Sequence, residues 1–291
     1  MQTWNVGKVK ITQIVELTFE GLDAFLPDAT PQAVLPIEWL QPDFITPQGV
    51  LRFSIHALVI DTGTRRIIVD TCVGNHKPRD VFPDWHMLHT NFLQDLAAAG
   101  YPADSIDTVM CTHLHLDHVG WNTMLEGEHW IPTFRNARYL IERDEFSYVQ
   151  GEAEAADVEE WLREMNRTVM SDSIQPIVDA DLVDLVGSDH VLCDEVQLIP
   201  TPGHTIGHVS VLVRSEGESA LITGDFVHHP CQLAHPEWSV TTDHDPQRSS
   251  ETRNETFARF ADTQTLVIGT HWPQPSAGKI KRWGAHYRLN T

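Results

Sequence analysis

The stretch Thr112–His118, which reads THLHLDH, carries the strongest chemical signal in this 291-residue chain. It places three imidazoles and one carboxylate within six residues, directly after the apolar run 106–111, which predicts a short strand. In an extended backbone, positions i and i+2 point to the same face, so His113 and His115 can converge on one metal ion. The carboxylate and the third imidazole follow where the chain turns and can reach a neighbouring ion. Because zinc accepts histidine nitrogen and aspartate oxygen, the stretch predicts a metal site.

One loop cannot close two metal sites, so further ligands are expected from distant parts of the chain. Three candidates stand where short apolar runs end, namely His204, Asp225 and His271. A glycine stands one or two positions before each of them, which suits a close approach of the backbone to a crowded site. The candidate metal ligands are therefore His113, His115, Asp117, His118, His204, Asp225 and His271.

Short strands joined by polar loops recur along the whole chain. Apolar patterning predicts strands at 9–19, 51–59, 65–70, 106–111, 139–141, 196–199, 209–213, 220–223 and 265–269. Helical spacing predicts helices at 84–99, 152–168 and 249–261, with Gly100 as the C-cap of the first. Two similar halves packed sheet against sheet, with helices outside, would form one four-layer α/β domain spanning residues 1–291.

Residues 20–50 form a proline-rich N-terminal arm with Phe25, Trp39 and Phe44 between the prolines. Proline at this density disfavours both a helix and a central strand. Two interpretations stay open: an extended arm packed on the domain surface, or an arm that lines the substrate cleft or clasps a second subunit.

Composition limits the partners and the compartment. The chain has 20 Lys+Arg and 41 Asp+Glu, a formal charge of −21, so binding to nucleic acid or to an anionic membrane surface is not expected. The four cysteines (Cys72, Cys111, Cys193 and Cys231) form no C-x-x-C pair and suggest buried free thiols. With neither an apolar leader nor an apolar run long enough to span a bilayer, we expect a cytoplasmic protein.

The H-x-H-x-D-H loop, followed in order by His204, Asp225 and His271, resembles the metallo-β-lactamase superfamily over nearly the whole chain. The resemblance implies a four-layer αβ/βα sandwich that binds two divalent metal ions, with Zn²⁺ preferred. Carried over by position, His113, His115 and His204 would bind the first metal. Asp117, His118 and His271 would bind the second, with Asp225 bridging both. The lactonase and methyl parathion hydrolase-like branch is the most similar, and the resemblance allows a homodimer.

This resemblance implies a hydrolase in which a hydroxide bridging two metals attacks a carbonyl or phosphoryl centre. Asp117 is the candidate catalytic residue, which would orient the nucleophile and pass a proton to the leaving group. The acidic surface favours a neutral small-molecule substrate. The resemblance to the lactonase and methyl parathion hydrolase-like branch implies a lactonase or esterase with phosphotriesterase side activity. The alternatives are a thioesterase similar to glyoxalase II and a mononuclear iron dioxygenase acting on thiols. A non-catalytic binding protein is disfavoured because the ligand set is intact.

Several other polar residues near the motifs have open roles. His228 and His229 follow Asp225 and could belong either to the pocket or to a solvent-facing loop, while His208 could support a ligand. Asp70 ends a predicted strand and is expected to support a metal ligand as well.

Cys72 stands where the family often has glycine, so a thiol is expected near the site. Asp243 and Asp245 are expected in a turn or helix cap. Five aromatic residues are expected near the mouth of the site: Trp39, Phe44, Trp121, Phe226 and Trp272.

Overall fold

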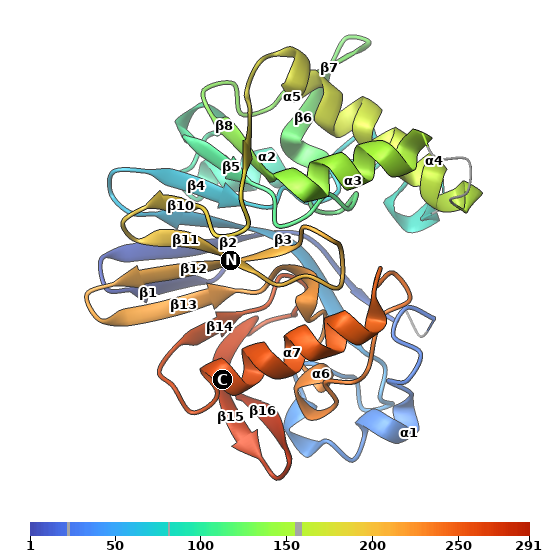
Figure 1. Ribbon diagram of the computed structural model, residues 1–291, viewed down its shortest axis with the longest axis vertical. Coiled ribbons are helices and arrows are strands. Elements are labelled where there is room, and N and C mark those ends of the chain that lie inside the picture. The colour runs from blue at the N-terminus through green and yellow to red at the C-terminus, as the bar shows by residue number, and fades with distance from the viewer. Residues whose placement is uncertain (22–23, 81, 155–158) are drawn as a thin grey trace. The chain divides into compact units, whose positions relative to one another are not determined.

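The strands form two seven-stranded sheets and a two-stranded ribbon (Figure 1). The computed structural model describes residues 1–21, 24–80, 82–154 and 159–291. Within them the chain divides into two compact units. Unit 1 comprises Met1–Asn5, Val9–Glu16 and Ile55–Gly187, and unit 2 comprises Val6–Lys8, Leu17–Ser54 and Ser188–Thr291. The expectation of one domain over 1–291 stays a prediction.

The first sheet has the order β1-β2-β3-β4-β5-β8-β9 and lies mostly in unit 1. Its strands are β1 (Thr3–Val6), β2 (Val9–Glu20), β3 (Arg52–Asp61), β4 (Arg66–Val69), β5 (Thr108–Met110), β8 (Arg138–Glu142) and β9 (Val183–Val186). The strands β6 (Thr123–Glu126) and β7 (His129–Pro132) form the ribbon. Because β4, β5, β8 and β9 are parallel, the loops after β4 and β5 leave the sheet at one edge.

The helical segments of unit 1 lie between these strands. These are η2 (Pro83–Trp85), α2 (Phe92–Ala98), η3 (Ala103–Ser105), η4 (Gly120–Asn122), α3 (Arg143–Glu154), α4 (Glu160–Val169), the π-helical turn η5 (Met170–Ile174) and α5 (Gln175–Asp179). Helix α3 lies against β8 and β9 and packs beside α4 (Figure 1).

The second sheet has the order β10-β11-β12-β13-β14-β15-β16 and lies within unit 2. Its strands are β10 (Val191–Cys193), β11 (Val196–Pro200), β12 (Val209–Ser215), β13 (Glu218–Ile222), β14 (Leu266–Ile268), β15 (Ala277–Trp283) and β16 (His286–Asn290). Strand β12 is antiparallel to both β11 and β13, and β13 is parallel to β14. The carboxyl ends of β11, β13 and β14 therefore meet at one edge of this sheet.

Unit 2 has a continuous hydrophobic core against this sheet. Its helices are α1 (Pro31–Val34), η1 (Glu38–Leu40), η6 (Gly224–Phe226), α6 (Cys231–Ala234) and α7 (Pro246–Phe260). Phe257 of α7 joins Leu221 and Val267 of the sheet in one buried cluster, and Val34 and Phe44 of the arm belong to the same cluster. The proline-rich arm thus supplies core side chains, a larger contribution than surface packing alone.

Most of the predicted strands are confirmed, although their ends differ by a few residues. The predicted helix 249–261 corresponds to α7. The helix expected at 84–99 is wrong in its first half: α2 begins only at Phe92, because Pro83 opens a separate 3₁₀ turn. The helix expected at 152–168 corresponds to the end of α3 and to α4, while residues 155–158 lie outside the described residues, as do 22–23 of the arm.

Two expectations on the chain as a whole can be compared with the structure. Cys72, Cys111 and Cys231 are buried free thiols, as predicted, and Cys193 is half-buried. Among the described residues, we find no helix with the length and apolar character needed to cross a membrane.

Candidate metal centre

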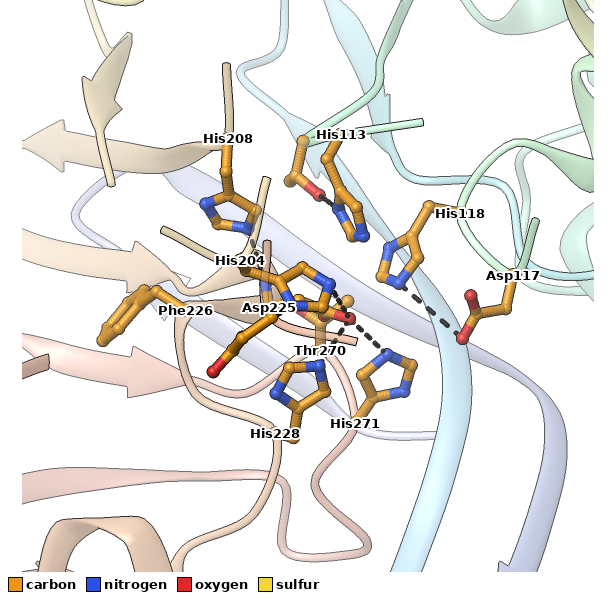
Figure 2. A network of polar contacts seen from close by, with 12 residues as sticks. His113, Asp117, His118, His204, His208, Asp225, Phe226, His228, Thr270 and His271 are labelled. Carbon is orange, nitrogen blue, oxygen red and sulfur yellow. Dashed lines mark hydrogen bonds and ion pairs between the residues drawn. The ribbon is translucent and has the colours of Figure 1, made fainter. Parts of the chain in front are cut away.

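The H-x-H-x-D-H loop follows β5 and gathers its four candidate ligands within unit 1. The ring centroids of His113 and His115 are 4.6 Å apart, and those of His113 and His118 are 4.1 Å apart. Asp117 Oδ2 lies 3.7 Å from His118 Nε2 (Figure 2). His113 and His118 are buried, whereas His115 and Asp117 keep partial exposure. The loop thus presents three imidazoles and a carboxylate at one place.

Asp70 holds this loop from the end of β4. Its Oδ1 accepts a hydrogen bond from the Thr112 backbone N–H at 2.8 Å, and its Oδ2 lies 2.9 Å from His118 Nδ1. A carboxylate can only accept here, so Nδ1 of His118 carries the proton and Nε2 is left to bind a metal. The expectation that Asp70 supports a ligand agrees with this geometry.

Two further features position the loop, and the sequence indicates only the second of them. The buried carboxylate of Glu145 accepts the Leu114 backbone N–H at 3.0 Å. Gly120 closes the loop against the backbone, since a Cβ there would lie 1.8 Å from the Val73 carbonyl oxygen. The signal for Gly120 was its place after the motif, but no local pattern marks Glu145, which comes from α3.

The three remaining candidate ligands meet in unit 2, around one carboxylate. Asp225 Oδ2 lies 3.0 Å from His271 Nε2 and 3.7 Å from His204 Nε2 (Figure 2). All three residues are at most 6% exposed. His204 follows β11, Asp225 follows β13 and His271 follows β14, and the carboxyl ends of these strands share one edge of the sheet.

His228 joins the same cluster, with Nε2 3.1 Å from Asp225 Oδ2. Burial lowers the pKa of His228 to about 4, so its imidazole is neutral at pH 7 and able to act as a ligand. Of the two readings left open for His228, the solvent-facing loop is wrong.

Asp243 supports His204 as Asp70 supports His118. Its Oδ1 lies 2.9 Å from His204 Nδ1, and its Oδ2 lies 3.6 Å from the Arg253 guanidinium. Burial alone would raise the pKa of Asp243, but the hydrogen bond to His204 and the positive charge of Arg253 lower it to about 2. The turn or cap expected for Asp243 misses this contact, whereas Asp245 does cap α7 by accepting the Arg248 backbone N–H.

Two more histidines hold the backbone of this cluster. His208 Nε2 accepts the Asp225 backbone N–H at 2.7 Å, so His208 fixes the carboxylate through its main chain. His229 Nδ1 accepts the Cys231 backbone N–H, and its Nε2–H donates to the Phe44 carbonyl at 2.9 Å. His229 is therefore buried and anchors the arm, and the solvent-facing reading is wrong for it as well.

The aromatic residues expected at the mouth lie mainly inside the units. Phe44, Phe226 and Trp272 belong to the core of unit 2 and are at most 2% exposed. Trp121 is buried in unit 1, where its Nε1–H donates to Glu16. The expectation of an aromatic mouth is wrong for these four residues, and Trp39 is only partly buried against the core. Cys72 is buried, and desolvation raises its pKa well above the ordinary value, so the thiol stays protonated.

The donor set fits divalent metal ions. Two of the candidate ligands, His118 and His204, have Nδ1 held by a buried carboxylate, so Nε2 would be the ligand atom. Nitrogen and oxygen donors in this mixture suit zinc.

Histidine and aspartate side chains that cluster after the strands of an α/β protein define a candidate metal centre. A family model described as the metallo-β-lactamase superfamily matches residues 50–271, and the chain belongs to this superfamily. Together with the solved structures below, this match confirms the predicted fold class, an α/β protein of the metallo-β-lactamase fold.

Relatives and solved structures agree with this assignment. The chain is 26% identical over 183 residues to an N-acyl homoserine lactonase of Bacillus cereus, covering 59% of this chain and 63% of the lactonase. It is 25% identical over 244 residues to a probable metallo-hydrolase of Mycobacterium bovis, covering 75% and 74%.

Among solved structures, the hydrolase AbOPH of the β-lactamase superfamily superposes with a TM-score of 0.81 at 26% identity, over 99% of this chain and 95% of that one. The dizinc quorum-quenching lactonase AidC superposes with a TM-score of 0.80 at 19% identity, over 99% and 96%, which shows the fold alone.

Proposed function

We propose that this protein is a dinuclear metal hydrolase that opens lactones or cleaves esters of neutral small molecules. The observation that carries the proposal is the pair of buried contacts from Asp70 to His118 Nδ1 and from Asp243 to His204 Nδ1, each 2.9 Å long. Carboxylates placed behind histidines in this way orient the imidazoles and raise their basicity as ligands.

Seven residues would hold two divalent ions, with Zn²⁺ preferred. In the proposed arrangement His113, His115 and His204 bind one ion, Asp117, His118 and His271 bind the other, and Asp225 bridges them. Such ions supply Lewis acidity and a water whose pKa is lowered toward 7. The ligand count supports two ions, since seven donors exceed the four of a tetrahedral site.

The chain's own residues then act on the substrate. Asp117 keeps partial exposure, so its carboxylate can orient the attacking water and carry a proton toward the leaving oxygen. The buried histidines exclude bulk water from the reacting centre.

A neutral substrate suits this protein best. The formal charge of −21 would repel an anionic substrate at long range. The lactonase relative supports lactones as the first class to examine. We extend the proposal to phosphotriester side activity, a cytoplasmic location and a homodimer, with no nucleic-acid or membrane partner.

The test combines metal analysis with a substrate panel of lactones, esters, thioesters and phosphotriesters. We expect about two equivalents of metal and highest kcat/KM on lactones or esters. Asp225→Ala should lose both metal and turnover, while Asp189→Ala, at an exposed aspartate of the same unit, should keep both. A metal-replete and fully active D225A protein would overturn the assignment. A preference for thioesters would favour the glyoxalase II-like alternative, and visible absorbance from bound iron would favour the dioxygenase.

A further inference from the structure

His228 occupies the same relation to Asp225 as His271, which is one of the proposed ligands. The Nε2 atoms of His228 and His271 lie 3.1 and 3.0 Å from the same oxygen, Asp225 Oδ2. Their rings are parallel, with an interplanar angle of 1° and centroids 5.7 Å apart (Figure 2). The two imidazoles therefore approach the carboxylate oxygen side by side.

The His228 contact differs from the His271 contact in one respect. His271 Nε2 is aligned with Asp225 Oδ2 for a hydrogen bond, but His228 Nε2 is not, and Nδ1 of His228 has no hydrogen-bond partner among the described residues. The side chain is 1% exposed, which separates it from bulk water. Buried polar atoms without a partner are rare and require an explanation. A nitrogen and an oxygen that lie close together without hydrogen-bond alignment are the arrangement expected of two ligands of one cation.

The surroundings provide the rest of a cation site. One ligand atom each from His204, Asp225 and His228 lies within 4.8 Å of the others, all three residues being buried in unit 2. An ion with bonds of about 2.0–2.2 Å can draw such donors together with a small adjustment. On its other side, the His228 ring packs edge-on against Phe25 of the arm, with ring centroids 5.1 Å apart, which limits its rotation.

We propose that His228 is a ligand of the metal bound at Asp225, so that unit 2 by itself holds one ion through His204, Asp225 and His228. This inference rests on the proposed function only in placing a metal at Asp225. It adds an eighth ligand to the seven, and it predicts that metal binding in unit 2 survives the loss of the loop ligands of unit 1.

The experiment measures metal binding in the full-length chain. In a His113→Ala/His115→Ala background we expect about one equivalent of Zn²⁺ or Co²⁺, measured by competition with a chromophoric chelator and by the Co²⁺ absorption spectrum. Adding His228→Phe, which keeps a planar ring, should weaken that remaining site by at least about 10-fold and change the Co²⁺ spectrum. His235→Phe, at a half-exposed histidine of unit 2, is the matched control and should leave both unchanged.

A second measurement does not depend on the variant folding. In the unsubstituted protein, the ¹⁵N resonance of the coordinating His228 nitrogen should shift on Zn²⁺ binding as those of His204 do. A His228 resonance that stays in place, or an H228F protein with unchanged affinity and spectrum, overturns the inference. These outcomes are independent of hydrolysis: tight binding without turnover would contradict the proposed function and leave His228 as a ligand.

Discussion

Replacing Asp243 by Asn should weaken metal binding at His204 without removing any ligand. The carboxylate is buried and lies 2.9 Å from His204 Nδ1, and its pKa of about 2 keeps it ionised at every working pH. Asparagine preserves the shape of the side chain but removes the negative charge that keeps the proton of His204 on Nδ1. Its amide group would also face the Arg253 guanidinium, which lies 3.6 Å from Oδ2 of Asp243.

The expected magnitude follows from removing a carboxylate behind a ligand histidine. Such changes reduce metal affinity about 10- to 100-fold, or about 1.4–2.8 kcal/mol. Competition with a chromophoric chelator would measure the affinity, and circular dichroism would show that the fold is retained. Asp245→Asn is the matched control, because Asp245 caps α7 and asparagine caps helices equally well.

Acid titration provides a second readout for the same variant. The folded pKa of Asp243 is about 2, below the reference value of 3.8, so its contribution to stability is present above about pH 4 and disappears as the pH falls through about 2. The difference in unfolding free energy between wild type and D243N, about 2 kcal/mol at neutral pH, should therefore shrink in acid. Unchanged metal affinity in D243N, with the fold intact, would refute the reasoning about His204.

Three further predictions concern stability and are measured by urea or thermal unfolding. His208→Phe should lower the free energy of unfolding by about 1–3 kcal/mol, because it leaves the buried Asp225 backbone N–H without its acceptor. His208→Gln can accept that hydrogen bond and should lower the stability less. Equal losses in the two variants would contradict this role of His208. Gly120→Ala should lower the free energy of unfolding by about 3 kcal/mol or more, because its Cβ would overlap the Val73 carbonyl oxygen. Gly151→Ala in α3, whose Cβ would meet nothing within 4 Å, should raise the free energy of unfolding by about 0.5–1 kcal/mol. Similar effects at both sites would contradict the close approach at Gly120. Burial lowers the pKa of Lys77 from 10.5 to about 7. Between these pH values the unfolded chain binds more protons than the folded chain, so the stability of the wild type relative to Lys77→Met should rise from pH 7 to pH 10. A stability difference that does not change with pH would contradict the pKa shift.

The candidate metal ligands could be proposed from the sequence because their signal is local. In Thr112–His118 the spacing of the side chains along the backbone already places several donors together. His204, Asp225 and His271 were found because each ends an apolar run, and the sheet confirms the reason: β11, β13 and β14 end at one edge. Residues that are far apart in the sequence therefore lie close together, because the strands that they follow end at the same edge of the sheet.

The supporting residues could not be predicted in the same way. Asp243 was assigned to a turn, since nothing in the sequence around it indicates that its carboxylate faces His204, 39 residues away. Glu145 reaches the metal loop from α3, and His208, directly before β12, reaches Asp225 after the neighbouring strand β13. These contacts depend on how helices and strands pack, which propensity and periodicity do not encode.

The sequence by itself determined the fold class and the chemistry of the first ligands, because both depend on short-range patterns of apolar and metal-binding residues. Only the tertiary structure decided which groups stand behind those ligands and what His228 and His229 do. Two adjacent histidines of identical local chemistry diverge: one turns toward Asp225 and the other anchors the arm at Phe44. The physical reason is that a buried imidazole must find partners for its ring nitrogens, and only the folded surroundings determine which partners those are.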